Sequence, residues 1–457
     1  MKKYILIILC CLTSFPLWSY NVNMIVEHYS VDQGLPNNTV NCTLKDRDGF
    51  IWFGTWYGLC CFDGVKFKTF NKQEHDSDVP PRKIQRIVED KNGYIWVKTI
   101  DRKLYVFNKV TECFHAVYDD MKNYSENIQV IKLQNTAEGD VLLLTKDKNL
   151  LLAGVDEKGQ VTIKILFDSR DEINKHDYTL KHHVLCETEE YISWIGTDYK
   201  VSAVHKGAEL ASRPADFITS KINSGDKDSF TSFFEDGRKV WVGDRAGIFY
   251  SIDVRTGLVN RYVLSEIKGA ISNLLVTPAG YVYLSVAGQG TYEYDLAERR
   301  LQKINTEMND AMVTHAFIDQ YDKIWFHENE KALIYYDPLN HTAKRFPFTM
   351  FGKITTLYSE DAGERGLFFL SPAGEAWLFD REHAEMVYIN KLKQLSNDRA
   401  NQQFYHLMLD NDGVLWLSSA DEGVYCMNFP KKQFNLLSLS PQSAGQENYA
   451  TGVRALF

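Results

Sequence analysis

Proline is scarce in this sequence, with 11 residues among 457, against 25 tyrosines, 26 phenylalanines and 9 tryptophans. After the first 19 residues, no stretch approaches the roughly 18 consecutive apolar residues of a membrane helix, so no membrane span is expected in the mature chain. With 44% hydrophobic and 24% charged residues, the composition excludes a disordered chain, a collagen and a coiled coil. A folded chain rich in aromatic residues and poor in proline favours β structure.

Long runs of one charge are also missing. The 51 basic and 60 acidic residues give a net charge of −9, and no five consecutive residues carry the same sign. Proteins that bind nucleic acid present a basic surface, so no nucleic-acid partner is expected.

The motifs of common catalytic and metal sites are absent from the sequence. It contains no Gly-x-Ser-x-Gly, no His-Glu-x-x-His and no P-loop. Asp46-x-Asp48-Gly49 begins like a calcium loop, but Tyr57 stands where an EF-hand needs its last glutamate, and the pattern fits a recurring hairpin turn. We therefore predict no catalytic residue, no metal site, no cofactor and no enzymatic activity.

Residues 1–19 have the pattern of a signal peptide. Lys2 and Lys3 precede a short apolar run at residues 4–12, and a small residue, Ser19, offers a cleavage point. We expect export to the periplasm and a mature N-terminus near Tyr20. The remaining cysteines show no zinc spacing, and we interpret them as small buried hydrophobic residues, although an exported protein can form disulfides.

One phrase recurs along the chain. Its clearest copy, residues 46–55, is an Asp-x-x-Gly turn followed by an apolar run that contains Trp52. Nine copies are recognisable, three of them without the tryptophan, and their anchor residues are Trp52, Trp96, Leu142, Trp194, Trp241, Tyr283, Trp325, Phe368 and Trp416. Their spacing of about 45 residues is typical of a four-stranded propeller blade.

The pattern inside each copy indicates short strands. Val40, Cys42 and Leu44 alternate before the first turn, and apolar runs follow at residues 50–53 and 59–62. A stack of such sheets must close into a ring or leave an apolar end exposed. We therefore predict an all-β fold, a β-propeller of four-stranded blades, in which the tryptophans fill the gaps between neighbouring sheets.

These residues resemble a known family. Residues 34–40, 46–55 and 62–64 are similar to the two-component regulator propeller repeat, and the resemblance extends over essentially residues 24–457. It implies the N-terminal periplasmic sensor region of a hybrid two-component system, which is anchored in the inner membrane and carries two seven-bladed propellers and a histidine kinase. No kinase motif is in this sequence, so we expect a fragment or a truncated product.

The number of rings stays open at this stage. Residues 20–347 would supply about seven blades of one propeller, and residues 348–457 would begin a second, truncated one. Alternatively, all nine repeats form one larger ring. Residues 25–29 precede the first repeat and have the pattern of an outermost strand that pairs with the other end of the chain.

The loop after each anchor strand varies between copies, which makes it the candidate ligand-binding region. Exposed aromatic residues beside charges suit stacking against sugar rings. The candidate ligand-binding residues are Trp56, Tyr57, Arg102, Tyr199 and Arg245.

We expect an oligosaccharide ligand, together with propeller contacts within the chain or in a homodimer. The leading hypothesis is a sensory, ligand-binding propeller that responds to glycan fragments. A stand-alone scaffold or binding module, and a propeller-fold carbohydrate-active enzyme, are the alternatives.

Overall fold

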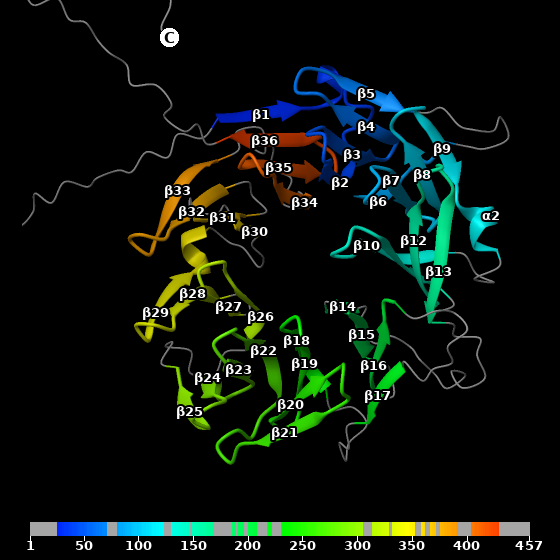
Figure 1. The fold of residues 1–457 in the computed structure, drawn as a ribbon. Helices are drawn as coiled ribbons and strands as arrows, with labels where there is room; N and C mark the ends of the chain where they lie inside the picture. Colours follow the sequence, from blue (N-terminus) through cyan, green and yellow to red (C-terminus); the bar gives the residue numbers. More distant parts are fainter. Residues whose placement is uncertain are drawn as a thin grey trace, which may run out of the picture.

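The computed structural model describes residues 25–70, 80–122, 129–146, 149–167, 185–188, 190–195, 200–207, 217–221, 230–304, 313–328, 331–351, 358–361, 366–371, 375–391 and 404–428. Within these residues the chain forms nine four-stranded antiparallel sheets, here called blades 1 to 9. The blades stand side by side around a ring, in chain order (Figure 1). The predicted all-β propeller is therefore confirmed.

Blades 1 to 8 each use four consecutive strands. Blade 1 contains β2 (Val40–Lys45), β3 (Ile51–Thr55), β4 (Gly58–Phe62) and β5 (Phe67–Phe70), and blade 2 contains β6 (Ile84–Glu89), β7 (Ile95–Thr99), β8 (Leu104–Asn108) and β9 (Cys113–Ala116). Blade 3 contains β10 (Val130–Asn135), β11 (Val141–Thr145), β12 (Leu150–Val155) and β13 (Val161–Phe167), and blade 4 contains β14 (Leu185–Glu187), β15 (Tyr191–Ile195), β16 (Lys200–His205) and β17 (Phe217–Lys221). Blade 5 contains β18 (Phe230–Glu235), β19 (Lys239–Asp244), β20 (Ile248–Asp253) and β21 (Val259–Val263), and blade 6 contains β22 (Ile271–Val276), β23 (Tyr281–Val286), β24 (Gly290–Asp295) and β25 (Arg300–Lys303).

The remaining blades complete the ring. Blade 7 contains β26 (Val313–Ile318), β27 (Ile324–Glu328), β28 (Ala332–Asp337) and β29 (Thr342–Pro347), and blade 8 contains β30 (Tyr358–Asp361), β31 (Leu367–Leu370), β32 (Glu375–Asp380) and β33 (Glu385–Lys391). Blade 9 combines β34 (Phe404–Leu409), β35 (Val414–Ser419) and β36 (Val424–Asn428) with β1 (Ile25–Tyr29). Short helical turns occur at η1 (Val31–Gln33), α2 (Tyr118–Met121) and η4 (Phe348–Phe351).

All nine anchor residues lie on the second strand of a blade. Where the structure describes the turn before the anchor, this turn closes the hairpin between the first two strands. In blade 1, Asp46 Oδ1 accepts hydrogen bonds from the backbone N–H of Asp48 and of Phe50, at 3.0 and 2.9 Å. Gly49 supplies the positive φ of 93°. Asp46 Oδ2 accepts a hydrogen bond from Trp52 Nε1 at 2.7 Å, which explains why aspartate and tryptophan recur together.

The same aspartate–tryptophan bond is present in blades 2, 5, 7 and 9. The Nε1 to Oδ2 distances are 2.9, 2.7, 3.3 and 3.2 Å for Trp96–Asp90, Trp241–Asp236, Trp325–Asp319 and Trp416–Asp410. Blade 6 has lost the tryptophan, and Tyr283 donates instead to the buried Glu293, at 2.9 Å. The buried indole and phenol groups of these anchor residues are thus paired, as a low-dielectric core requires.

Apolar side chains of two neighbouring blades form each core cluster. In the part of the chain that the structure describes, nine such clusters join all nine pairs of neighbours. Blades 7 and 8 are joined by Trp325 and Phe369, whose ring centroids lie 5.4 Å apart. Blades 9 and 1 are joined by Trp416 and Phe53, at 5.8 Å. The prediction that the tryptophans fill gaps between sheets is confirmed for these residues.

The pairing of β1 with β36 closes the ring. The register runs from Ile25 opposite Asn428 to Tyr29 opposite Val424. The larger-ring alternative is therefore the one that forms. Strands β30 to β36 continue the first ring and do not begin a second, so the division considered at residue 347 is no domain boundary. The physical reason is the core that joins blades 7 and 8.

The first strand of each blade lies on the inside of the ring (Figure 1). Among the described strands, seven of these carry a bulge near their start; in β6 the register shifts between Ile84 and Arg86. The bulge lets a polar side chain reach the next blade. Asn41 Nδ2 donates to the carbonyl of Ile84 at 2.6 Å, and Thr231 Oγ1 donates to that of Ile271 at 2.7 Å.

The predicted signal peptide, residues 1–19, lies outside the described residues. Among the helices that the structure describes, none is long and apolar enough to cross a membrane. Five cysteines are free and buried, as the small-hydrophobe interpretation predicted: Cys42, Cys60, Cys61, Cys113 and Cys426.

Candidate functional site

The described turns between the second and third strands lie on one face of the ring. Strand direction alternates within a blade, so these turns share an end of the sheet with the connections that lead from blade to blade. Backbone hydrogen bonds tie the two together: Lys83 N donates to Trp56 O at 2.9 Å, and Ile100 N donates to Lys83 O at 2.9 Å. We call this end of the blades the loop face.

Trp56 and Tyr57 form the turn between β3 and β4 on the loop face of blade 1. Their side chains are 37% and 60% exposed, which confirms the predicted loop position of Trp56. The Nζ of Lys83 lies over the indole of Trp56, 5.3 Å from the ring centroid. A cation and two exposed aromatic rings thus share one surface, and Ile100 extends it toward blade 2.

Arg102 lies in the corresponding turn of blade 2, between β7 and β8. Its backbone has a positive φ of 69°, which is rare for arginine and costs about 1 kcal/mol. Hydrogen bonds hold this conformation: Arg102 N donates to Thr99 O at 2.9 Å, and Val130 N of blade 3 donates to Arg102 O at 2.9 Å. The position of Arg102 is therefore fixed by two blades.

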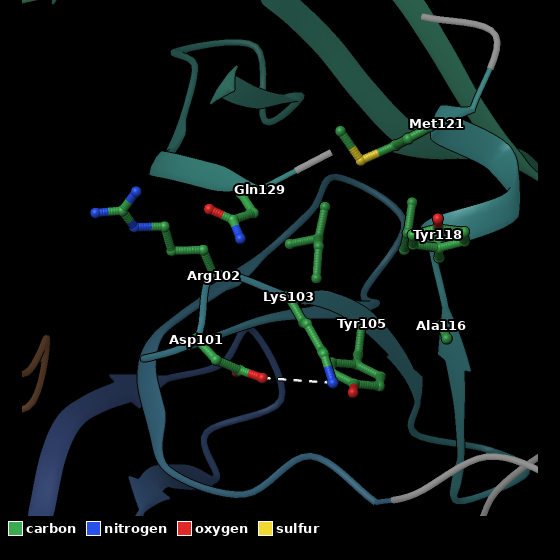
Figure 2. A pocket seen from close by; sticks show the side chains of 10 residues that line it. Asp101, Arg102, Lys103, Tyr105, Ala116, Tyr118, Met121 and Gln129 are labelled. Atoms are coloured by element: carbon green, nitrogen blue, oxygen red, sulfur yellow. Dashed lines mark ion pairs between the residues drawn. The ribbon is translucent and has the colours of Figure 1, made fainter. Parts of the chain in front are cut away.

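A hollow of about 290 Å³ opens beside Arg102. This volume is close to the lower limit for small-molecule binding sites. Figure 2 shows the turn of blade 2 on one side of it and helix α2 on the other. Its lining residues are Asp101, Arg102, Lys103, Leu104, Tyr105, Ala116, Val117, Tyr118, Met121 and Gln129. A buried apolar floor is thus combined with two aromatic rings, one amide and three charged groups.

The hollow is lined by two basic side chains, Arg102 and Lys103, and one acidic side chain, Asp101. Asp101 forms an ion pair with Lys103, whose Nζ lies 3.4 Å from Oδ2, and accepts a hydrogen bond from the hydroxyl of Thr99. Burial works against the Asp101 carboxylate, but these two partners outweigh it and lower its pKa. Within the described part of the chain, no carboxylate lies at ion-pair distance from Arg102. The hollow therefore has an excess of positive charge.

The structure brings together three of the five predicted site residues. Trp56, Tyr57 and Arg102 lie on neighbouring turns of blades 1 and 2. Arg245 is exposed in the turn between β19 and β20 of blade 5, on a distant part of the ring (Figure 1), so it does not belong to this surface. Tyr199 lies outside the described residues.

Sequence reasoning missed the half of the hollow that follows blade 2. Tyr118 and Met121 belong to α2, in the connection between two blades, where no repeat pattern applies. The signal that was available is the length of this connection, which leaves room for a helical turn before β10.

An acidic cluster on the opposite face has a resident cation. Asp46, Asp48 and Glu89 present carboxylate oxygens within 4.8 Å of one another. Lys109 Nζ lies 3.0, 2.7 and 2.8 Å from them. Burial disfavours the ammonium, but its hydrogen bonds to these three groups outweigh burial and raise the pKa of Lys109. The ammonium takes the place that a metal ion would need.

These features define a β-propeller with a concave, positively charged site on its loop face. Comparison of its sequence with family models gives one match, at residues 34–57, to the two component regulator propeller. This segment covers η1, β2, β3 and the turn that carries Trp56 and Tyr57. The chain thus carries a two component regulator propeller repeat, and the resemblance found in its sequence is confirmed.

Solved structures of propellers are similar to the chain at low identity. The extracellular domain of BT4673 from B. thetaiotaomicron, assigned to a hybrid two component system, is 15% identical with a TM-score of 0.39; the match covers 87% of this chain and 65% of that one. The Dos1 propeller is 12% identical with a TM-score of 0.47, over 88% and 94%. Virginiamycin B lyase from Staphylococcus aureus, an enzyme, is 8% identical with a TM-score of 0.34, over 89% and 99%. No curated protein matches the chain.

Proposed function

We propose that this chain is the periplasmic, ligand-binding propeller of a two-component signal transduction protein, and that it binds glycan fragments on the loop face of blades 1 and 2. The observation that carries the proposal is that the exposed Trp56 and Tyr57 and the hollow beside Arg102 lie on neighbouring turns of the loop face. Sugar rings stack on exposed aromatic side chains, while amide and charged groups bind their hydroxyls.

The same geometry supports binding without catalysis. Asp101 is the one carboxyl group that lines the hollow, and its lowered pKa keeps it ionised and paired with Lys103. A general acid needs a raised pKa, and a glycosidase needs two carboxyl groups facing each other. Neither condition is met by the residues that line the hollow.

Calorimetry of residues 20–457 against a panel of oligosaccharides tests the binding. Trp56→Ala and Arg102→Ala are expected to weaken binding at least tenfold. Arg245→Ala is the matched control, because Arg245 occupies the same kind of turn in blade 5. Equal losses at Arg245 and Arg102 would contradict the placement of the site, and cleaved sugars in mass spectra of the mixtures would contradict a role limited to binding.

Export is the second half of the proposal. It rests on Lys2, Lys3 and the apolar run at residues 4–12. N-terminal sequencing of the periplasmic fraction is expected to start near Tyr20. Recovery of the chain with Met1 in the cytoplasm would contradict it.

A further inference from the structure

Lys98 is a buried lysine on the strand that leads into the turn of Arg102. It lies on β7 with only 5% of its surface exposed. Its amine donates a hydrogen bond to Gln85 Oε1, a neutral acceptor. Within the described residues no carboxylate lies at ion-pair distance from it. An ammonium that is removed from water without a counter-charge is energetically costly, and folded proteins rarely retain one without a reason.

Two further cations lie near Lys98. The register of β6 and β7 places Arg86 directly opposite it, and like charges in opposite positions destabilise a sheet. Arg102 follows Lys98 in the β7–β8 turn and lines the hollow. Burial lowers the pKa of Lys98, and the guanidinium groups of Arg102 and Arg86 lower it further.

The three cations have no acidic neighbour that neutralises them. In the described part of the chain, neither Arg86 nor Arg102 forms an ion pair, and Asp101 is engaged by Lys103 and Thr99. Three other cations of this protein do have counter-charges: each of them forms ion pairs with two or more carboxylates. They are Lys109, Lys206 and Arg381. Within the described residues, a counter-charge is therefore missing at this buried lysine and its two arginine neighbours, and a ligand can provide it.

We propose that Arg86, Lys98 and Arg102 bind an anionic substituent of the ligand, a carboxylate or a sulfate group. Two guanidinium groups can each form paired hydrogen bonds with such an oxyanion, and the ammonium adds a buried charge. The inference rests on the proposed function, since it names the chemical class of the sugar: an acidic oligosaccharide with its rings along the loop face and its charge at the cations.

Calorimetry with four probes tests the inference on residues 20–457. Trigalacturonate carries carboxylates, a sulfated chondroitin disaccharide carries a sulfate ester, galactotriose is neutral, and sodium sulfate is the anion without a sugar. We expect one or both acidic sugars to bind at least tenfold more tightly than galactotriose. We also expect this advantage to shrink when sodium chloride rises from 20 to 300 mM, because salt screens charges.

Variants locate the anion site. Arg102→Gln and Arg86→Gln are expected to weaken binding of the acidic sugar at least tenfold, and Arg245→Gln is expected to leave it unchanged. Lys98→Met is expected to remove the same binding without lowering the melting temperature, because a chain of similar shape replaces a buried charge. This combination separates loss of a ligand contact from loss of the fold.

The outcomes distinguish the two proposals. Acidic sugars that bind no better than galactotriose, or that bind equally well to Arg102→Gln, would overturn the anion site, while tight binding of galactotriose would still support the proposed function. Sulfate that binds the wild type but not Arg86→Gln, with no sugar bound, would support the anion site and overturn glycan binding. No binding of any probe would overturn both.

Discussion

Lys45 of blade 1 forms an ion pair with Asp410 of blade 9, with Nζ 3.4 Å from Oδ2, across the junction where the ring closes. The same oxygen of Asp410 accepts the hydrogen bond from Trp416. Asp46 likewise accepts both Trp52 of its own blade and Lys109 of blade 2. The turn aspartate therefore holds its own tryptophan and a cation of the following blade at once, which couples the interior of one blade to its neighbour.

The anchor tryptophans are expected to dominate stability. Trp52 and Trp241 are 3% and 2% exposed, so Trp52→Ala and Trp241→Ala should each lower the free energy of unfolding by about 3–5 kcal/mol through the cavity they leave. Trp56→Ala should cost much less, since its ring is on the surface. Urea midpoints at an unchanged slope measure the difference. Similar losses for Trp52 and Trp56 would show that the two positions are not distinguished by burial.

Removal of the Lys109 ammonium should allow the acidic cluster around it to bind a metal ion. Lys109→Met leaves Asp46, Asp48 and Glu89 without their ammonium, and we expect a loss of about 3 kcal/mol, because the Asp46 side chain is fully buried. Millimolar calcium should restore part of this stability, since oxygen ligands suit calcium. Thermal melting with and without calcium measures it, with Lys109→Arg as the control that keeps the charge. An equal calcium response in the wild type would contradict the role of Lys109.

The closing strand pair can be locked covalently. Glu27 lies directly opposite Cys426, and opposite residues of an antiparallel pair have the Cα separation that a disulfide needs. Glu27→Cys should therefore form a disulfide with Cys426 under oxidising conditions and migrate faster on a non-reducing gel. Glu27→Ser is the matched control without a thiol. A reduced, uncrosslinked Glu27→Cys would show that β1 does not pair with β36 in solution.

Acidification below neutral pH should destabilise the ring through His406. Burial, with a contribution from nearby Arg86, lowers the pKa of His406 to about 4, and Nδ1 has no hydrogen-bond partner among the described residues. In the unfolded chain the His406 imidazole takes up a proton near pH 6.5, whereas in the folded chain it does so only near pH 4. The free energy of unfolding is therefore unaffected by this group above pH 6.5 and decreases as the pH falls toward 4. Between pH 7 and 4.5 we expect a loss of about 1–2 kcal/mol from this group, allowing for its partial exposure.

Denaturant midpoints of the wild type and of His406→Gln at these pH values test the assignment. The variant should lose less stability on acidification. A parallel decline of the two proteins would assign the pH dependence to other groups, of which His327 is one, because burial and His315 lower its pKa in the same direction.

Much of the fold was predictable because it repeats. The Asp46-to-Trp52 phrase encodes a turn and its hydrogen bond locally, so a short window of sequence is enough to recognise a blade. The number of blades in the ring was not predictable, because it depends on whether β1 pairs with β36. This contact joins segments that are far apart in the sequence, and no local sequence pattern indicates it. Trp56 and Arg102 were found as variable loop residues. Tyr118 and Lys98 were missed, since α2 lies outside the repeat and strand periodicity does not reveal that Lys98 lacks a carboxylate partner.

The pairing of β1 with β36 also has a kinetic consequence. His28 Nε2 lies 2.6 Å from the carbonyl oxygen of Glu422, 394 positions away along the chain. Contacts of such high sequence separation form late, because the loop they close carries a large entropic cost. We therefore expect the surface of blade 1 that faces blade 9 to stay solvated until blade 9 has folded. We also expect β1 to be the last strand that pairs during folding, and its release to be the first step by which the ring opens.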